Sequence, residues 1–342
     1  MQSSRQPSRI PIDPAIQFSL APDAIPTFKE QGESFLLRLA SRKHKPVHES
    51  TIFTWKHNLN HWIYPAIGEL QLSEVSNATI KPLIAAMVAE GLKASYVNAM
   101  FRLIVTIVAS YLDGQGEPVY SRQWNPDFLD LPLIIPRELN RPCFNGDIVS
   151  KLACWRYPRA QMIFILAASS GARISELLGL DIRQHISWDF STLRIARQAI
   201  HGRLVEYVKT QASYREIDRH SSVSTMLKHF IGTRESGLLF CSRKGTPIYL
   251  NGILDVHLHP ALHEYGYVNS CTGTHLAGMH AFRRFRNTLL GSCPGLPDRL
   301  RMYWMGHRAG TMIEKYDQVM MDRAFRRMWA ERCGIGFALP PA

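Results

Sequence analysis

The sequence predicts a mainly α-helical protein of two domains, the second of which carries a small antiparallel β-sheet. Apolar residues recur at helical spacing through most of the 342-residue chain. Only residues 192–219 change to the alternation that is typical of strands. A stretch rich in proline and glycine, residues 116–145, interrupts both periods and predicts a linker between the domains. A chain of this length can bury two separate cores.

The first domain is expected over residues 26–115. It follows a proline-rich leader, residues 1–25, which predicts an extended or disordered segment. Four helical patterns then succeed one another, at 27–43, 50–65, 77–91 and 94–113. The last pattern, SYVNAMFRLIVTIVASYL, is apolar over much of its circumference, so this helix should form the centre of the domain.

The second domain is expected over residues 146–342. Its strand-like segments are TLRIARQ, LVEYV and YREID, and His201-Gly202 between the first two suits a hairpin turn. Helical patterns occupy most of the remainder, at 146–155, 158–169, 221–231, 250–265, 278–291, 297–305, 309–316 and 318–332.

Composition excludes several classes of protein. Hydrophobic residues make up 46% of the chain and charged residues 20%, which is a globular mixture rather than a disordered one. The longest apolar stretch, residues 162–168, is far shorter than the ~20 residues of a membrane span. The first residues lack the apolar core of a signal peptide. Six cysteines without paired spacing exclude a disulfide scaffold and favour a reducing, cytoplasmic compartment.

The excess positive charge belongs to the C-terminal part of the chain. Residues 1–140 hold 13 basic and 13 acidic residues, whereas residues 141–342 hold 27 basic and 15 acidic ones, which accounts for the whole net charge of +12. Such an excess favours a polyanionic partner, because each phosphate contact releases condensed counterions. Within the neutral part, one basic cluster suits either a local face that contacts phosphate groups or an ordinary solvated helix end; it consists of Arg38, Arg42, Lys43 and Lys45.

The segment HAFRRFRNTLL, residues 280–290, separates apolar and charged side chains on a predicted helix. Two phenylalanines and a leucine share one face, and the opposite face carries His280, Arg283, Arg284 and Asn287. A guanidinium fork matches the oxygens of a phosphate, and a nearby imidazole can move a proton. Taken alone, the polar face equally suits an ordinary solvated helix.

Three further segments carry side chains suited to phosphate chemistry. In SSGARISELLGL, Arg173 and Glu176 lie three residues apart at a helix start, where the helix dipole also favours an anion. Lys209 lies at a strand-to-turn junction. In MGHRAGTMIEKY, His307 follows a glycine and Tyr316 ends a short helical stretch. Each has an ordinary alternative when taken alone, as a surface ion pair, a solvated lysine or a packed tyrosine.

Taken together and in this order, these residues resemble the tyrosine recombinases, the phage-integrase family. SGARISELLGL is similar to the family's first arginine box, HAFRRFRNTLL to its H-x-x-R box, and MGHRAGTMIEKY to its G-H…Tyr ending. The resemblance covers about residues 145–333 and implies a C-shaped clamp, in which a helical core-binding domain and a catalytic domain close on DNA. The chain departs from the family at Arg284, where a second histidine is often found. With the basic cluster of residues 38–45, Arg284 is a candidate contact with the DNA that the resemblance implies.

The resemblance implies a reaction. Tyr316 would attack a scissile DNA phosphate, form a 3′-phosphotyrosyl link and release a 5′-hydroxyl group. Arg173 and Arg283 would bind the non-bridging oxygens and stabilise the charge of the transition state. His280 would accept the phenolic proton, and Lys209 would protonate the departing oxygen.

Supporting roles and partners follow from the same resemblance. His307 would bond a phosphate oxygen, and Glu176 would orient the neighbouring basic groups. The reaction would need no ATP, metal or other cofactor, and strand exchange would pass through a Holliday junction. The implied partners are double-stranded recombination sites, accessory DNA-bending proteins and the other copies of a homotetramer. The C-terminal helix, residues 318–332, would dock on a neighbouring copy or on its own domain. A nucleoid location and a prokaryotic or phage origin are also implied.

Three other readings stay open. A metal site is conceivable in one segment, although its spacing matches neither HExxH nor a paired CxxC framework; the residues are His257, His259, His263, Cys271 and His275. A non-catalytic DNA-binding protein would use the same basic surface for capture alone. A type IB-like topoisomerase would use the same chemistry and reseal the same strand.

Overall fold

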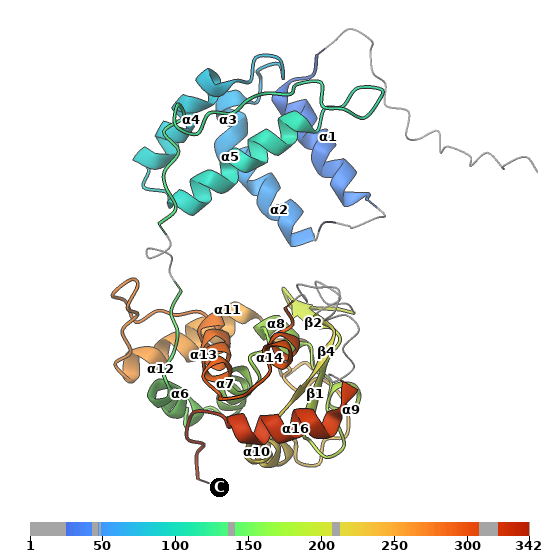
Figure 1. The fold of residues 1–342 in the computed structure, drawn as a ribbon, viewed down its shortest axis with the longest axis vertical. Helices are drawn as coiled ribbons and strands as arrows, with labels where there is room; N and C mark the ends of the chain where they lie inside the picture. The colour runs from blue at the N-terminus through green and yellow to red at the C-terminus, as the bar shows by residue number, and fades with distance from the viewer. Residues whose placement is uncertain are drawn as a thin grey trace, which may run out of the picture. The chain divides into compact units, whose positions relative to one another are not determined.

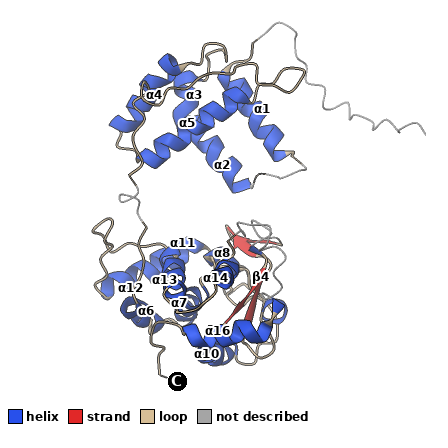
Figure 2. Ribbon diagram, in the orientation of Figure 1, coloured by secondary structure: helices blue, strands red, loops and turns tan. Residues whose placement is uncertain are grey.

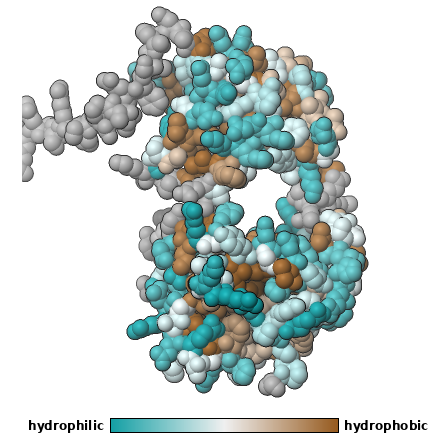
Figure 3. Space-filling model, turned by 180° about the vertical axis from the view of Figure 1, so that it is seen from behind, coloured by the Kyte–Doolittle hydropathy of each residue, from teal (hydrophilic) through white to brown (hydrophobic). Residues whose placement is uncertain are grey.

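The computed structural model of the chain describes residues 25–42, 47, 49–135, 141–206, 213–307 and 321–341. The chain divides into two compact units, Met1–Arg137 and Glu138–Ala342, and helices dominate both (Figure 1, Figure 2). This confirms the predicted class, mainly helical with a little antiparallel strand. Hydrophilic residues cover much of the visible face of each unit (Figure 3). None of the described helices is long and apolar enough to cross a membrane.

The first unit is a group of helices packed around α5. Its elements are α1 (Phe28–Ala40), α2 (Glu49–Asn58), η2 (Leu59–Ile63), α3 (Tyr64–Ile67), α4 (Asn77–Ala89) and α5 (Ala94–Ala109). Thr27 and Ser76 begin α1 and α4 with capping boxes, in which side chains satisfy backbone N–H groups of the first turn. The helix α5 buries Val97, Ile104 and Ile107 and packs against α1 and α4, so the predicted centre of the domain is confirmed.

Most of the segment predicted as a linker is part of the first unit. Leu129 is buried in the core of that unit, and Asn77 on α4 accepts a hydrogen bond from the backbone of Asn125 at 3.1 Å. Phe144, near the other end of the segment, is buried in the second unit, and the boundary between the units follows Arg137. The prediction of a linker over residues 116–145 was therefore too wide. Scattered apolar side chains between the prolines provide enough burial to fix this backbone.

The second unit is built around α7 (Pro158–Ser170), whose residues from Met162 to Ser170 are all buried. The helix α13 (His280–Gly291) packs against it, with Phe282 stacked on Phe164 at 5.5 Å between ring centroids. Other elements of the unit are α6 (Gly146–Ala153), α8 (Ile174–Leu178), α9 (Ile182–His185), α10 (Ser221–Ile231), α11 (Leu250–Ile253), η5 (Leu254–Leu258), α12 (His259–Glu264) and α14 (Asp298–Met305). The predicted helix 309–316 lies outside the described residues.

The predicted strand region forms two short antiparallel ladders. β1 (Thr192–Ile195) pairs with β4 (Arg215–Asp218), and β2 (Gln198–Ile200) pairs with β3 (Arg203–Val205). His201 and Gly202 connect β2 to β3 with φ values of 47° and 73°. Two consecutive positive φ angles are typical of the tight turn of a hairpin, so the predicted turn is confirmed.

The helix α16 (Arg323–Cys333) packs on its own unit in this structure. Arg326 donates from Nε to Asp218 Oδ2 at 2.7 Å and from Nη2 to Glu216 Oε2 at 2.5 Å, and both acceptors lie on β4. Trp329 is buried in the core of the unit. The backbone N–H of Ser221, at the start of α10, donates to Glu331 at 2.7 Å. Of the two placements that the sequence allowed, the single chain adopts the one on its own domain.

Candidate active site

The site begins where α7 ends. Gly171 reverses the chain with a φ of +65°, and a Cβ there would lie 2.9 Å from the sulfur of Met305. Only glycine meets both demands. Two residues later Arg173 caps the short helix α8 from an extended conformation, which places its half-buried side chain beside the third residue of that helix, Glu176. The predicted contact between Arg173 and Glu176 is thus present.

Glu176 is a buried carboxylate held by four hydrogen bonds. Oε1 accepts from Arg173 Nη1 at 2.7 Å and from Arg215 Nη1 at 3.2 Å. Oε2 accepts from the Arg173 backbone N–H at 2.8 Å and from Arg215 Nη2 at 3.0 Å. Burial opposes ionisation of this carboxyl group, but the charges and hydrogen bonds of Arg215 and Arg173 outweigh it and lower the pKa of Glu176. The group therefore remains an anion at neutral pH.

Arg215 is a member of this cluster that the sequence reasoning missed. Its side chain is 0% exposed, and Nε donates to the Trp304 carbonyl oxygen at 2.7 Å. Its guanidinium occupies the space where a Cβ of Gly306 would lie, 2.9 Å from the Arg215 Cζ atom. A signal was present in the strand pattern, because Arg215 shares a face with buried Ile217 and a charged residue on a buried face requires a partner.

Arg283 joins the first and last predicted boxes. From α13 it donates through Nη1 to the Gly171 carbonyl oxygen at 2.7 Å and through Nη2 to the Met305 carbonyl oxygen. Nη2 also lies 3.2 Å from His307 Nε2. Burial and the nearby charge of Arg173 lower the pKa of Arg283 to about 10, so the guanidinium stays charged at neutral pH. The predicted pair of arginines thus lies beside the predicted histidine.

Both predicted histidines are exposed and favour the neutral form. Burial of part of the ring, followed by the charges of Arg284 and Arg283, lowers the pKa of His280. Burial and then Arg283 and Arg173 lower the pKa of His307 in the same way. A guanidinium can only donate, so His307 Nε2 is the acceptor of the contact with Arg283 and the ring proton resides on Nδ1. Neutral His280 retains a nitrogen that can accept a proton.

A cavity of about 370 Å³ opens over these side chains. It is lined by Cys143, His280, Arg283, Arg284, Asn287, Thr288, Met305 and His307. Arg284, expected to contact DNA, donates through Nη1 to the Pro142 carbonyl oxygen at 2.8 Å and thereby ties α13 to the chain before α6. The structure therefore brings five of the predicted residues close together; they are Arg173, Glu176, His280, Arg283 and His307.

Several predicted residues fall outside the part of the chain that the structure describes. They are Tyr316, Lys209, Lys43 and Lys45. Of the basic cluster in the first unit, Arg42 is exposed. Arg38 donates through Nη2 to the Ser110 carbonyl oxygen at 3.2 Å and ties α1 to the end of α5. That bond gives Arg38 a structural role beside the predicted contact with DNA.

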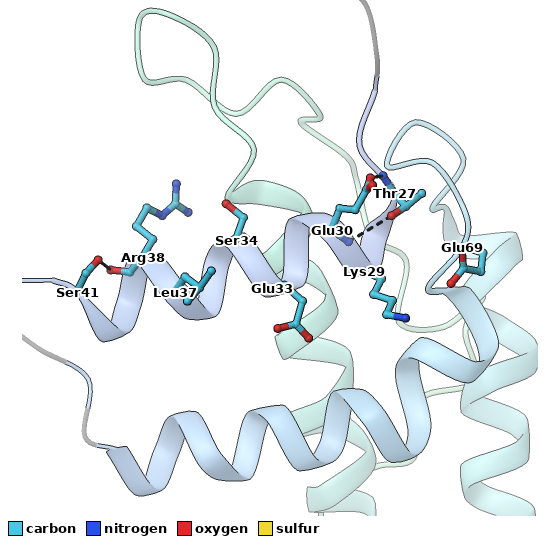
Figure 4. Close-up of a pocket in the computed structure, with 9 residues that line it drawn as sticks. All are labelled: Thr27, Lys29, Glu30, Glu33, Ser34, Leu37, Arg38, Ser41 and Glu69. Carbon is cyan, nitrogen blue, oxygen red and sulfur yellow. Dashed lines mark hydrogen bonds between the residues drawn. The ribbon is translucent and has the colours of Figure 1, made fainter. Parts of the chain in front are cut away.

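A larger groove of about 980 Å³ runs along α1 and contains Arg38 (Figure 4). Glu30, Glu33 and Glu69 also line it, against two basic residues. Three carboxylates repel a phosphate backbone, so this groove does not suit DNA. The cavity of the second unit, lined by histidine and arginine, suits a phosphate far better.

The histidine-rich segment of the second unit does not form a metal site in the described residues. No group of three or more His, Cys, Asp or Glu side chains within them could hold a metal ion. The rings of His263 and His275 stack edge to face at 5.0 Å between centroids, and His275 Nδ1 contacts the Tyr267 carbonyl oxygen. These contacts are those of packed side chains.

Comparison with known proteins identifies the family. The sequence model of the Phage integrase family matches residues 151–323, which is half of the chain and includes the whole cluster described above. The chain belongs to the phage integrase family. Its members are tyrosine recombinases, so the resemblance found in the sequence is confirmed. Among curated proteins, none matches this integrase-family chain significantly.

Solved structures show that both units have an integrase fold. The Tn1549 transposon integrase in complex with transposon right end DNA matches with a TM-score of 0.64 at 18% identity, over 89% of this chain and 98% of that one. A lambda integrase tetramer bound to a Holliday junction matches with a TM-score of 0.57 at 14% identity, over 89% and 84%. The XerH site-specific recombinase bound to its difH substrate matches with a TM-score of 0.53 at 13% identity, over 87% of this chain and 97% of that one.

Proposed function

We propose that this integrase-family protein is a site-specific recombinase that cuts and rejoins DNA through a 3′-phosphotyrosyl intermediate. The observation that carries the proposal is that segments far apart in the sequence bring together Arg173, which binds the buried carboxylate of Glu176, and Arg283, which contacts His307. Family membership supports the reaction class, and the geometry supports the residues.

The charge of the cluster suits a phosphate. Three guanidinium groups, those of Arg173, Arg215 and Arg283, surround the single carboxylate of Glu176. The surplus of positive charge is partly buried, where electrostatic interactions are stronger than in water. A scissile phosphate in the cavity would supply the missing anion, and the additional charge of a pentacoordinate transition state would be stabilised further.

The steps of the reaction are assigned to individual groups. Tyr316 attacks the phosphorus, its phenolic proton passes to neutral His280, and Lys209 protonates the departing 5′-oxygen. Arg173 and Arg283 bind the non-bridging oxygens, and His307 donates from Nδ1–H to one of them. The phosphodiester bond is exchanged for a phosphotyrosyl bond, so no ATP is required. The 5′-hydroxyl group of a partner strand reverses the attack and passes the DNA through a Holliday junction.

The partners follow from the same proposal. The helical domain over residues 26–115 and the catalytic domain over 146–342 both bind double-stranded recombination sites, the helical domain through Arg42 and its neighbours Lys43 and Lys45. Four copies assemble on the DNA, and α16, which packs on its own unit, contacts the next copy with exposed residues such as Met328. Accessory DNA-bending proteins assist the assembly. The protein acts on DNA in the cytoplasm, at the nucleoid. The structural neighbours bound to DNA, among them the lambda integrase tetramer, support this arrangement.

Covalent trapping tests the proposal. A binding site is first selected from random-sequence DNA, and a nick is placed beside the cleavage position so that the 5′-hydroxyl fragment diffuses away. The wild-type protein accumulates a covalent adduct on this substrate, and Tyr316→Phe accumulates none while it binds the DNA with unchanged affinity. Tyr249→Phe, at an exposed tyrosine of the same unit, serves as the control and behaves as wild type. An adduct formed by Tyr316→Phe contradicts the assignment of the nucleophile.

A further inference from the structure

Arg215 is placed beneath the site rather than in it. Its side chain is fully buried, whereas that of Arg173 is 30% exposed. The Arg173 guanidinium donates through Nη1 to Glu176 Oε1 and, at 3.3 Å, to Ser213 Oγ. Arg215 binds both of these residues, through its fork to Glu176 and through Nη1 to the Ser213 carbonyl oxygen at 2.8 Å. Arg215 therefore binds both residues that accept hydrogen bonds from the Arg173 guanidinium.

Arg215 and Arg173 share the hydrogen bonds to the two oxygens of the Glu176 carboxylate, and this sharing limits how Arg173 can bind it. Arg215 takes one position on each carboxylate oxygen, and Arg173 takes the others with its backbone N–H and a single side-chain nitrogen. No bond from Nη2 or Nε of Arg173 to Glu176 is described. Without the positive charge of Arg215, Arg173 would be the remaining counter-charge of the buried Glu176 carboxylate. The Arg173 guanidinium would then turn and bind Glu176 with two nitrogens in a bidentate pair.

We propose that Arg215 is a positioning residue that keeps the free edge of the Arg173 guanidinium turned toward the scissile phosphate. The inference rests on the proposed function for the identity of that phosphate. A second contact extends the role to the other side of the site. Arg215 Nε binds the Trp304 carbonyl oxygen, and the guanidinium fills the space beside Gly306, so it also holds the turn that presents His307.

The test compares Arg215→Met, Arg215→Lys and the control Arg326→Met. Arg326 is an equally buried arginine that pairs with the carboxylate of Asp218 on the same strand, and it lies outside the cluster. Single-turnover formation of the adduct is measured per folded molecule, together with the affinity for the DNA and a crystal structure of each variant. Arg215→Met should lose at least 10-fold in rate with its DNA affinity unchanged, and Arg215→Lys should recover part of the loss. Arg326→Met should retain the wild-type rate.

The crystal structures keep the outcomes distinct. In Arg215→Met, or in Arg215→Lys if the first variant does not fold, the Arg173 fork should close on Glu176 in a bidentate pair. A wild-type protein that forms no adduct overturns the proposed function, while the position of Arg173 in the variants still decides the inference. Arg173 unmoved in the variants, or a loss of rate in Arg326→Met as large as in Arg215→Met, overturns the role of Arg215.

A separate observation concerns two cysteines that the sequence spacing did not connect. Cys293 follows α13, Cys333 ends α16, and their sulfur atoms lie 2.7 Å apart with both thiols free and partly exposed. Two thiol sulfurs this close need little movement to join. The segment between them contains His307 and Tyr316. A bond between the sulfurs would hold both ends of that segment on the same unit.

We infer that Cys293 and Cys333 form a site of reversible oxidation by low-molecular-weight disulfides. Cys333 donates its S–H to the sulfur of Cys293, and this hydrogen bond stabilises the Cys293 thiolate, so Cys293 is the first nucleophile. The Cys293 thiolate attacks oxidised glutathione and releases one glutathione thiolate. Cys333 then loses its proton, attacks the mixed disulfide and releases the second. Two protein thiols are oxidised, and one glutathione disulfide is reduced to two thiols.

Peptide mapping without reduction tests this site. The reduced protein is incubated with oxidised glutathione and digested. A cross-link between the peptides of Cys293 and Cys333 is expected, whereas the exposed Cys143, Cys154 and Cys271 should carry glutathione. The cross-link should also raise the unfolding temperature of the wild-type protein. In Cys333→Ser the glutathione should remain on Cys293, and oxidised glutathione should no longer raise the unfolding temperature. Glutathione on Cys293 and Cys333 of the wild type, without a cross-link, overturns the inference.

Discussion

The two ends of strand β4 carry buried ion pairs of different character. At one end, Asp218 accepts from Arg326 Nε at 2.7 Å and from Trp304 Nε1 at 3.0 Å, and the charges of this pair cancel. At the other end, Arg215 binds Glu176, which also holds the half-exposed Arg173. The first pair is buried and fixes α16, whereas the second includes the partly exposed Arg173 and carries more positive than negative charge. An ion pair with equal positive and negative charge stabilises the fold, whereas a cluster with an excess of positive charge can also bind an anion.

The largest expected effect concerns the buried pair of Asp218 and Arg326. Asp218→Ala leaves Arg326 with the half-exposed Glu216 as a counter-charge and removes the acceptor of the buried Trp304 Nε1–H, so the free energy of unfolding should fall by about 3–5 kcal/mol. Denaturant unfolding measures this loss. Because Asp218 contacts no residue of the cavity, adduct formation per folded molecule should not change. A specific loss of cleavage in this variant would erase the distinction between the two pairs.

Removal of a phosphate-binding guanidinium should affect the reaction almost as strongly. Arg283→Ala should raise the barrier to cleavage by about 3–4 kcal/mol, as is typical of a lost oxyanion donor. The matched control is Arg286→Ala, on the same helix, where a buried guanidinium donates to the Gly334 carbonyl oxygen at 2.6 Å. Single-turnover trapping distinguishes them. Equal loss per folded molecule in both variants would show that Arg283 acts only through folding.

A smaller effect is expected at the turn beside Arg215. Gly306→Ala places a Cβ 2.9 Å from the Arg215 guanidinium at a φ of +64°, which should destabilise the fold by about 1–3 kcal/mol and slow cleavage. Gly334→Ala has a similar φ of +61° with no neighbour within 4 Å, so it should suffer the strain alone. Thermal unfolding and trapping of both variants provide the comparison. Equal cleavage in the two would exclude a role for this contact.

The smallest effect concerns pH. His280 is active as an acceptor when neutral, and its pKa is lowered from 6.5, so the rate should fall only at pH values below this ordinary value. Arg284→Gln removes one of the charges that lower the pKa of His280, so the acid limb of the pH–rate profile should move upward. Arg243→Gln, at an exposed loop, is the control. An acid limb that Arg284→Gln leaves in place would argue against His280 as the acceptor.

The local parts of the site could be predicted from the sequence. The two faces of α13, the contact of Arg173 with Glu176 and the glycine before His307 all depend on spacings of a few residues. The family resemblance predicted that these segments form one active site, because no local pattern indicates that they lie close together.

The remainder depended on contacts between distant residues. Arg215 and Glu176 lie 39 residues apart, and only the pairing of β4 with β1 and the position of α8 bring them together. The linker was drawn too wide for a related reason. Prolines indicate where regular structure stops, but they do not indicate whether the irregular chain is packed, and Leu129 shows that here it is.

The most direct test of the central claim is to identify the residue that carries the DNA. The trapped adduct is digested with nuclease and trypsin, and the peptide bearing a nucleotide is sequenced by mass spectrometry. Cleavage after Lys315 and Arg323 yields the peptide YDQVMMDR, in which Tyr316 is the sole tyrosine. The account predicts a nucleotide 3′-phosphate on Tyr316. A nucleotide on any other residue, or a 5′-phosphate linkage, would contradict it.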